Sequence, residues 1–592
     1  MNGFLMRALC FFLSMALSLG SAAESKSSAP LNITLLHTND IHGHIHSWTG
    51  WEGELEGKTV GGMDRIAGAI KQVRDSRGRE QILLLDAGDT LGDTEVAADT
   101  KGSAVIEIMN AIGYDAMVVG NHEPDFGPDV LKERMKQARF PILAANVVDA
   151  QSGVLYAKPY LIKTVNGVKV GIVGLAYPNT ALTTARKNVA GLQFDDPQNA
   201  AAKYIPKMRE DGAQIIVVLS HYGLSADREL AKAVPGIDVI VGGHSHNRMK
   251  EAIREGQTLI VQAGAHGSDL GRLDLTIENG RVLSHRRSLI VLEHKSVAAD
   301  PQITALIEQN YKRNDIEPAI AEAVGPIIRA QTLADQEPAK RDQQSPADSL
   351  FADLLRARTG AEVALLPGVG YGVAITQPAI TEEQLRNLIP HDSKSVTLTL
   401  SGAALVQVLE QAVENVYTED PLKKVGGMIQ VSGIRFRYDP QRPFSERVTA
   451  VQIGEDSVDP KRDYRVVTNS LLAEGGHNYK ALMQGKNKKE GEPVYNVIKE
   501  AITELGKVRA PHDRRINNNS NVAQRVGVGV LNQLLGIDAE SCPQCAGPAK
   551  AVQAITASEA IQRIFAQFGL PIGAAPPATS VPLRDERAKE QP

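Results

Sequence analysis

Short runs rich in Val, Ile and Leu recur along the first half of this 592-residue chain. Such runs, bounded by turn-forming residues, are typical of buried β-strands. Strands are predicted at Leu31–Leu36, Ile82–Leu85, Ala116–Val119, Ile215–Leu219 and Asp238–Val241, with a second set at Tyr160–Thr164, Val168–Val173, Leu259–Gln262 and Leu273–Ile277. Helices are predicted between them at Asp64–Arg77, Ala104–Ile112 and Asn199–Glu210. Mixed strands with flanking helices favour an α/β fold in which two sheets pack together with helices outside.

The same pattern divides the chain into several parts, because a chain of 592 residues exceeds what one ordinary core can bury. Residues 31–297 are predicted to form a first α/β domain, and Asp300–Tyr311 to lie in a linker helix within residues 298–325. Residues 326–516 are predicted to form a second α/β domain. Its predicted elements are helices at Leu350–Arg358 and Gly402–Val416 and strands at Glu362–Leu366, Ser395–Leu400 and Tyr464–Asn469. Residues 517–592 are predicted to be a C-terminal extension with a helix at Ala549–Phe568 and a disordered tail.

The first 23 residues have the pattern of a secretory signal peptide. Arg7 supplies a positive charge, Ala8–Gly20 an apolar core, and Ser21-Ala22-Ala23 a cleavage site of small residues. This core is shorter than the roughly 20 apolar residues that a membrane-spanning helix needs, and no later segment approaches that length. We therefore expect an exported chain, periplasmic or extracellular, without a transmembrane segment.

Net charge limits the classes of binding partner, and cysteine content indicates a possible disulfide. A formal net charge of −5, without a dense basic stripe, argues against a nucleic acid polymer as partner, and no protein partner is indicated. Export would remove Cys10 and leave Cys542 and Cys545 in a Cys-Pro-Gln-Cys segment. In an oxidising compartment this pair can close a disulfide loop; half of a zinc ribbon and a redox motif are the alternatives.

Polar residues that suit metal binding follow each of the five strands named first. In an open α/β sheet ligands bind beyond the carboxyl ends of the strands, so these residues are expected to meet. They are Asp40, His42, Asp89, Asn121, His221, His244 and His246. Such a set can hold two metal ions, and a carboxylate with two oxygens suits the position that both ions share. We assign Asp89 to that bridging position.

The other six residues divide between the two ions. One site is completed by Asp40, His42 and His246, and the other by Asn121, His221 and His244. Imidazole and carboxylate ligands favour Zn, Mn, Fe or Co over Ca or Mg without choosing among the four. Paired cations lower the pKa of a shared water, supply hydroxide near neutral pH and neutralise phosphoryl oxygens. Hydrolysis of a phosphate ester by attack of this hydroxide is the predicted chemistry.

His122 and Asp125 are the predicted catalytic pair. His122 adjoins a ligand on an irregular loop, and a carboxylate three residues later can orient and charge its imidazole. The pair is expected to stabilise the transition state and to help the leaving oxygen depart. For His44 a solvated loop position is favoured over metal ligation. Structural or surface roles are expected for His37, His266, His285, His294 and His512.

Five motifs carry the predicted ligands and the catalytic pair: Thr38–Gly43, Ala87–Asp89, Gly120–Asp125, Ser220–Gly223 and Gly242–His246. The second domain adds Ile434–Phe436, Tyr438–Pro440, Tyr464–Asn469 and Gly475-Gly476. From residue 31 to about residue 516 the chain resembles the calcineurin-like metallophosphatases and, more closely, the exported bacterial 5′-nucleotidase family. The resemblance implies a four-layer αββα catalytic domain joined by a helix to an α/β substrate-binding domain. It also implies domain rotation that carries substrate to the metals, and the ligand and catalytic roles given above.

The second domain departs from the family pattern at the positions that grip the nucleoside. Arg341 aligns with one family arginine, but Gly372, after Pro367-Gly368, stands where the family has another. His391 replaces the first of two phenylalanines that hold the nucleobase, and Leu471 or Leu472 falls near the second.

His477 replaces a family aspartate after the Gly-Gly pair. The residues available to replace the lost rings are Tyr371, His391, His477 and Tyr479. The predicted substrate-binding residues are Arg341, Tyr371, His391 and His477.

The predicted function is an exported, two-metal phosphohydrolase of the 5′-nucleotidase type that acts on nucleotides and serves nucleotide catabolism. The alternative keeps the metal centre but hydrolyses a non-nucleotide ester, because the nucleoside-binding Arg and Phe positions are not matched. A Pro-Gly turn at this place is also shared with the dimanganese thiosulfohydrolases of sulfur oxidation. A non-catalytic binding protein is the third hypothesis, and it is disfavoured because no metal ligand is lost.

Overall fold

A computed structural model describes residues 29–51, 53–311, 318–329, 341–369, 374–376 and 378–519. The predicted signal peptide, the Cys542–Cys545 pair, the helix at Ala549–Phe568, and Tyr371 and Gly372 lie outside the described residues. The elements discussed below belong to one unit that extends to Asn517. Within the described ranges, every helix is too short or too polar to cross a membrane.

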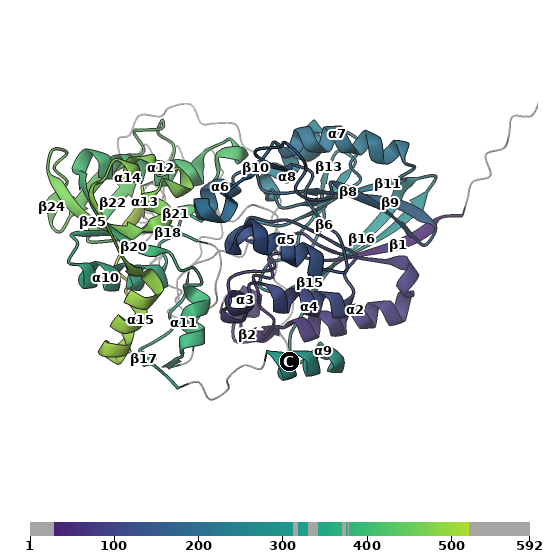
Figure 1. The fold of residues 1–592 in the computed structure, drawn as a ribbon, viewed down its shortest axis with the longest axis horizontal. Helices are drawn as coiled ribbons and strands as arrows, with labels where there is room; N and C mark the ends of the chain where they lie inside the picture. Colours follow the sequence, from purple (N-terminus) through teal and green to yellow (C-terminus); the bar gives the residue numbers. More distant parts are fainter. Residues whose placement is uncertain are drawn as a thin grey trace, which may run out of the picture. The chain divides into compact units, whose positions relative to one another are not determined.

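Two six-stranded sheets form the centre of the first domain (Figure 1). One has the order β16 (Arg281–Val291), β15 (Asp269–Glu278), β1 (Leu31–Thr38), β4 (Ile82–Asp86), β5 (Ala116–Val118), β6 (Ile142–Leu143). The other has the order β13 (Ile253–Glu255), β14 (Thr258–Val261), β12 (Val239–Gly242), β11 (Ile215–Ser220), β9 (Val168–Leu175), β8 (Tyr160–Val165). Five of these strands precede the predicted metal ligands. In the first sheet β4 pairs in parallel with both β1 and β5, and in the second sheet β11 pairs in parallel with β12.

The two sheets share one apolar core. Side chains such as Leu35 and Leu85 from the first sheet pack with Val170 and Val217 from the second. Strands that are buried on both faces have nearly continuous apolar sequences, so the sequence pattern predicts their positions. The prediction of two packed sheets is confirmed.

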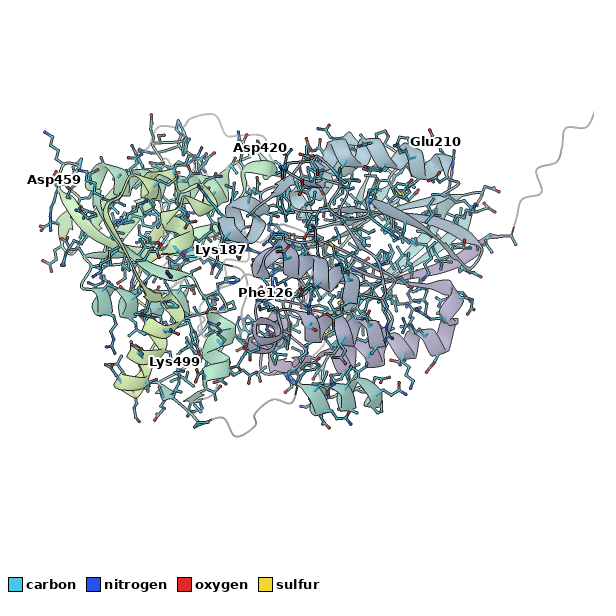
Figure 2. All side chains as sticks on the ribbon, in the orientation of Figure 1. Phe126, Lys187, Glu210, Asp420, Asp459 and Lys499 are labelled. Carbon is cyan, nitrogen blue, oxygen red and sulfur yellow. The ribbon has the colours of Figure 1, made fainter. Side chains whose placement is uncertain are left out.

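Helices cover the outer face of each sheet and complete the four αββα layers. The first sheet is covered by α2 (Met63–Arg77), α4 (Ser103–Ile112), α5 (Pro128–Gln137) and α9 (Pro301–Asn310), and the second by α7 (Pro197–Glu210) and α8 (Leu224–Ala233). In α7 the apolar residues face the sheet, whereas Glu210 at its end is exposed (Figure 2). The helix predicted as a linker, α9, buries Ile303 and Ile307 in the core of the first domain. The linker role of residues 298–325 and the domain boundaries stay predictions.

Helix ends follow local chemistry. The Asp196 side chain accepts a hydrogen bond from the Gln198 amide at the start of α7, and Pro197 occupies the first turn. Asp300 caps α9 in the same way through Gln302 and Ile303. Such caps satisfy amides that the helix itself leaves unpaired, so the sequence marks these starts.

The second domain is built on a five-stranded sheet. Its order is β21 (Gly427–Ser432), β18 (Val363–Gly368), β25 (Asp463–Asn469), β20 (Lys394–Ser401), β26 (Lys486–Pro493). One apolar core includes helix α12 (Gly402–Tyr417), and a second includes α10 (Pro346–Thr359), α11 (Glu382–Leu388) and α15 (Val494–Leu505). The expected second α/β domain is therefore confirmed.

One strand end differs from the prediction. We expected the strand at Glu362–Leu366 to end before Pro367-Gly368, but β18 continues through Gly368 with a register shift between Leu366 and Gly368. A side chain at Gly368 would bring its Cβ within 2.3 Å of the Met428 carbonyl oxygen. Glycine thus permits close strand pairing here, rather than forming the turn that Pro-Gly usually indicates.

Candidate metal centre and substrate pocket

The predicted metal ligands all lie just beyond the carboxyl ends of their strands. Asp40 and His42 follow β1, Asp89 follows β4, Asn121 follows β5, His221 follows β11, and His244 and His246 follow β12. The structure brings these seven side chains together. Because the two sheets pack face to face, the ends of strands from both contribute to one site.

The backbone bends sharply at these residues. Asp40, His42, Asp89, His244 and His246 have φ values of 51°, 50°, 54°, 70° and 59°. Non-glycine residues adopt this left-handed conformation uncommonly, and it concentrates at functional sites that the surrounding structure holds in place. The hold is visible here, because the amide of Asp40 donates to the Gly88 carbonyl at 2.8 Å and that of His42 to the Asp89 carbonyl at 2.9 Å.

Three of the side chains form one half of the centre. The Nε2 atoms of His42 and His246 face each other at 3.1 Å, and Oδ1 of Asp40 lies 3.3 Å from Nε2 of His246. All three side chains are buried. Two imidazole nitrogens and a carboxylate oxygen converging in this way match the ligands of a divalent cation.

The other half is formed by Asp89, His221, His244 and Asn121. Oδ2 of Asp89 lies 2.9 Å from Nε2 of His221, and Oδ1 of Asn121 lies 2.8 Å from Nδ1 of His244. Asp89 also lies within 4.8 Å of a ligand atom of His42, so its carboxylate borders both halves. This position is the one that a bridging carboxylate requires.

Buried nitrogen atoms support the fit of a cation. Nε2 of the fully buried His221 lies 2.9 Å from Oδ2 of Asp89 and 3.9 Å from Oδ1 of Asp40. A buried imidazole nitrogen between two carboxylates suits a divalent cation. Burial also lowers the pKa of His42 and of His244 well below the ordinary value, which favours the neutral imidazole that binds metal.

Charge at the second half is concentrated on Asp89 and His221. Burial alone would raise the pKa of Asp89, but the imidazoles of His221 and His122 hold it well below its ordinary value. Burial likewise opposes the charged form of His221, yet Asp89 raises the pKa of that ring to about 10. Each group therefore favours the charged form of the other.

Residues behind the ligands fix their orientation. Nδ1 of His221 lies 2.7 Å from the Ala87 carbonyl oxygen, and Nδ1 of His42 lies 2.5 Å from Oδ2 of the buried Asp93. The Glu123 carboxylate accepts the amides of Asp89 at 3.0 Å, Thr90 at 2.8 Å and Gly120 at 2.5 Å. Sequence reasoning gave no role to Asp93 or Glu123. Glu123 stands inside the Gly-Asn-His-Glu motif, and that place is the signal that could have indicated it.

His122 and Asp125 form the pair that the sequence predicted. Nδ1 of His122 lies 2.7 Å from Oδ2 of Asp125, and the Thr184 hydroxyl donates to Oδ1 of Asp125 at 2.7 Å. Burial alone would lower the pKa of His122, but Asp93 and Asp125 raise it well above its ordinary value. His122 is therefore an oriented, positively charged imidazole beside the metal ligands.

The other histidines fall into two groups. The prediction that His44 lies in a solvated loop is wrong, because His44 is only 4% exposed and packs against His266 with 4.6 Å between ring centroids. The turn that buries Asp40 and His42 continues through Gly43 and carries His44 inward. His37 and His266 are buried, and His285, His294 and His512 are exposed, as expected.

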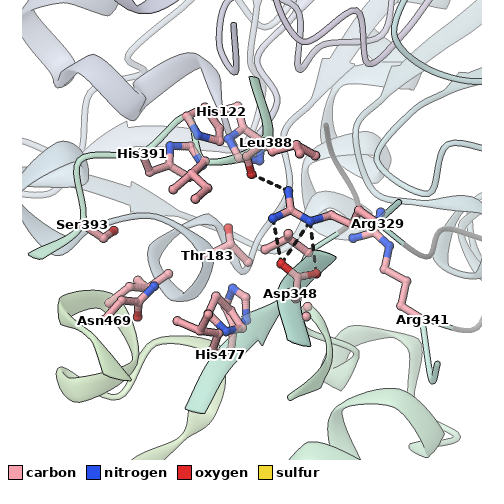
Figure 3. Close-up of a pocket in the computed structure, with 18 of the residues that line it drawn as sticks. His122, Thr183, Arg329, Arg341, Asp348, Leu388, His391, Ser393, Asn469 and His477 are labelled. Atoms are coloured by element: carbon pink, nitrogen blue, oxygen red, sulfur yellow. Dashed lines mark hydrogen bonds and ion pairs between the residues drawn. The ribbon is translucent and has the colours of Figure 1, made fainter. Parts of the chain in front are cut away.

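A pocket opens next to the candidate metal ligands (Figure 3). His42, Asp89, Asn121, His244 and His246 line one part of it, and His122 lies beside them. The second domain contributes polar lining from Arg329, Arg341, Asp348, His391, Ser393, Asn469 and His477, and apolar lining from Phe351, Leu366, Leu388, Ile389, Leu471 and Val494. The structure thus places three of the predicted substrate-binding residues, Arg341, His391 and His477, around one pocket.

The alternatives that the sequence left open differ in whether they line the pocket. Leu471 lines it, whereas Leu472 is buried in the domain core. Tyr479 is buried in the same core and is not among the residues that line the pocket. Phe351, which sequence reasoning missed, lines the pocket from α10 and falls within the helix predicted at Leu350–Arg358.

Arg341 and His477 are each fixed at the pocket by a hydrogen bond to a main-chain carbonyl, and that of His477 itself accepts from Nδ2 of Asn415 at 2.8 Å. Arg341 donates from Nη2 to the His244 carbonyl at 3.3 Å. His477 has a φ of 50°, and burial lowers its pKa to about 4, so its imidazole is neutral. The sequence placed both residues by alignment, and it could not have indicated either contact.

Two family models match the chain. Residues 33–248 match the calcineurin-like phosphoesterase model, and residues 324–484 match the model of the 5′-nucleotidase C-terminal domain. The trifunctional nucleotide phosphoesterase YfkN of Bacillus subtilis is 28% identical over 81% of this chain, which spans only 34% of that longer protein. Snake venom 5′-nucleotidase of Naja atra is 29% identical, with 80% of this chain and 96% of the relative covered.

Two solved structures from Thermus thermophilus are similar over most of their length. A 5′-nucleotidase precursor has a TM-score of 0.73 and 28% identity, and 82% of this chain and 99% of that chain are covered. The sulfate thiohydrolase SoxB, solved with glycerol, has a TM-score of 0.74 and 26% identity, and 82% and 96% are covered. Both alternatives that the sequence left open are thus represented among the similar structures.

Proposed function

We propose that nucleotides are the substrates of this chain. The chain belongs to the family that joins a calcineurin-like phosphoesterase domain to a 5′-nucleotidase C-terminal domain, and it is a metal-dependent phosphoric ester hydrolase. The observation that carries the proposal is the meeting of seven candidate ligands beside a pocket lined by Arg341 and His477. A site of this kind can hold the ester at the metals and the rest of the molecule in the second domain.

The division of ligands predicted from the sequence fits the geometry and is part of the proposal. Asp40, His42 and His246 would hold one divalent cation, Asn121, His221 and His244 the other, and Asp89 both. Zn, Mn, Fe and Co remain the candidate metals. When bound, two such cations supply a water of lowered pKa as nucleophile and neutralise phosphoryl oxygens.

The His122 imidazole would act on the phosphoryl group and on the leaving oxygen. Asp125 holds Nδ1 of His122, which leaves the other ring nitrogen as the donor. A charged donor fixed in this way stabilises negative charge that develops in the transition state and can protonate the departing alkoxide. Arg341, a cation within the same pocket, would hold a phosphate oxygen.

The nucleoside would lie against the second domain. Phe351 supplies one aromatic ring to the pocket, and Asn469, His391 and His477 supply hydrogen-bonding groups. Stacking of a base on an aromatic ring contributes about 1–3 kcal/mol. We also propose, from the residues before position 24, that the chain is exported and acts outside the cytoplasm.

A second candidate function uses the same metal centre to hydrolyse an ester that is not a nucleotide. The similarity to the sulfate thiohydrolase and the absence of a phenylalanine at positions 391 and 471 favour a substrate without a nucleobase. Hydrolysis of a thiosulfate conjugate would then release sulfate from the same pocket.

A substrate panel distinguishes the two candidates. The purified chain is stripped of metal, reloaded with Zn²⁺, Mn²⁺, Fe²⁺ or Co²⁺, and assayed with nucleoside monophosphates, simple phosphomonoesters and a peptide-linked thiosulfate. Phosphate release from nucleotides that exceeds the release from simple esters in kcat/KM supports the proposal. Sulfate release without phosphate release establishes the alternative, and no release from any ester contradicts both.

A further inference from the structure

A second cluster of metal-binding groups lies next to the candidate metal centre. It consists of Asp93, His122 and Asp125 from the first domain and His391 from the loop between α11 and β20 of the second. Each residue offers one ligand atom, and these atoms all lie within 4.8 Å of one another. Figure 3 shows His391 beside His122 at the pocket, and their rings are parallel within 2° at 5.6 Å between centroids.

The closest contacts within the cluster use both oxygens of Asp93 and both ring nitrogens of His391. Oδ1 of Asp93 lies 3.4 Å from Nε2 of His391, and Nδ1 of His122 lies 3.6 Å from Oδ2 of Asp93. Oδ2 of Asp125 lies 2.7 Å from Nδ1 of His122 and 3.8 Å from Nδ1 of His391. Neighbouring ligands of a tetrahedral zinc ion, with bonds of about 2.0–2.1 Å, stand about 3.3 Å apart.

One atom of the cluster lacks a hydrogen bond. Asp93 is 3% exposed and its Oδ1 atom has no hydrogen-bond donor among the described residues, although its Oδ2 atom is engaged by His42. A buried carboxylate oxygen in this situation is costly unless a cation faces it. Two carboxylates and two imidazoles also give the charge and ligand types that suit a divalent transition metal.

We propose that Asp93, His122, Asp125 and His391 form a third, separate site for a divalent cation of the zinc type. The site has ligands from both domains, so a bound ion ties the loop that carries His391 to the catalytic domain. This ion would also occupy Nδ1 of His122 and Oδ2 of Asp125, the two atoms that otherwise bond to each other. Excess metal should therefore inhibit turnover, a consequence that rests on the proposed function, whereas the binding of the ion does not.

Metal counting tests the binding itself. The full chain is loaded with Zn²⁺ or Co²⁺ and its bound metal is measured after equilibrium dialysis across a range of free ion. We expect two tight equivalents and a third, weaker one in the native protein. His391→Phe and His391→Gln should each lose only the third, because glutamine keeps a hydrogen-bond donor but is a poor zinc ligand.

The control variant and the contrary results are judged by the same measurement of bound metal equivalents. His285→Phe removes an exposed histidine outside the cluster and should keep all three equivalents. Cobalt absorption gives a second readout, since the third equivalent should add a ligand-field band that both His391 variants lack. A native protein that binds only two equivalents, or a third equivalent that survives both His391 substitutions, overturns the proposal.

Inhibition is then compared within each protein. For the native chain and His285→Phe, turnover should fall several-fold as Zn²⁺ passes from two to three equivalents, whereas His391→Phe and His391→Gln should show no such fall. A third equivalent without any turnover in any protein would contradict the proposed function and leave the site in place. Turnover in a native protein that binds no third equivalent would contradict the third site and leave the proposed function in place.

Discussion

Nδ1 of His42 lies 2.5 Å from Oδ2 of Asp93, a buried carboxylate that was not among the predicted site residues. Metal-binding histidines commonly donate their second nitrogen to a carboxylate, which fixes the ring and strengthens the ligand. Asp93 therefore orients the candidate ligand His42 with one oxygen while its other oxygen faces His391 of the second domain.

Replacing Asp93 should weaken metal binding at the site that includes His42. Asp93→Asn keeps the volume but removes the charge that orients the imidazole, and we expect a loss of about 10–100-fold in affinity for one of the two tight metal equivalents. Isothermal titration of the metal-free protein measures this. Glu133→Gln, an exposed carboxylate, is the matched control, and equal affinity in Asp93→Asn and the native protein would contradict the role.

Asp89 should be needed for both metals. Asp89→Ala removes the one carboxylate that borders both halves of the centre, so both metal content and turnover should be lost together. Elemental analysis of the purified variant measures the first and phosphate release the second. Retention of two metals in Asp89→Ala would show that another residue bridges them.

His122 should affect turnover and not the two tight metals. His122→Ala removes a charged donor from the reacting groups, and general-acid groups of this kind contribute about 10²–10⁴-fold to rate. The two tight metals should remain, because neither half of the centre uses His122. Asp125→Asn should lower kcat by a smaller factor through loss of orientation. Loss of the two tight metals from His122→Ala would mean that His122 is a ligand of the two-metal centre.

A ring at position 471 should improve nucleotide binding. Leu471 lines the pocket and is one of the two residues predicted near the family's second phenylalanine, so Leu471→Phe is expected to lower the KM for nucleotides about 5- to 100-fold through base stacking. KM for a simple phosphomonoester should not change. Leu472→Phe is the matched control, since that residue is fully buried and the larger ring should instead destabilise the fold by about 1–3 kcal/mol.

Asp227 should make stability fall as pH rises. Burial raises the pKa of Asp227 to about 8, although the Ser220 hydroxyl donates to it at 2.5 Å. The folded chain then holds a proton that the unfolded chain releases near pH 4, so stability declines between about pH 4 and 8, by at most about 1.4 kcal/mol per pH unit. Asp227→Asn should remove this decline, which denaturant unfolding at several pH values measures. An equal slope in both proteins would contradict the assignment.

The gathering of the seven candidate ligands was predictable because the sequence features that place each of them are local. Each ligand follows a strand whose apolar run is visible in the sequence, and the parallel arrangement brings strand ends together without further information. The His122–Asp125 contact was predictable for the same reason, since three residues separate the two side chains on one short loop.

The pocket was less predictable because it depends on side-chain direction and on contacts between distant segments. Leu471 and Leu472 are neighbours of the same type, and only the backbone decides which one faces the pocket. His44 was misjudged since nothing local shows that the turn after His42 is buried. The pairing of Asp93 with His391 joins residues about 300 positions apart, and no pattern of spacing indicates it.

The two-metal centre is tested most directly by a crystal structure of the purified protein carrying two metal equivalents, with anomalous scattering measured at the absorption edge of the metal found in it. The account predicts two adjacent peaks, one among Asp40, His42 and His246 and one among Asn121, His221 and His244, with Asp89 in contact with both. A single peak, or peaks elsewhere while these seven side chains hold no metal, would contradict it.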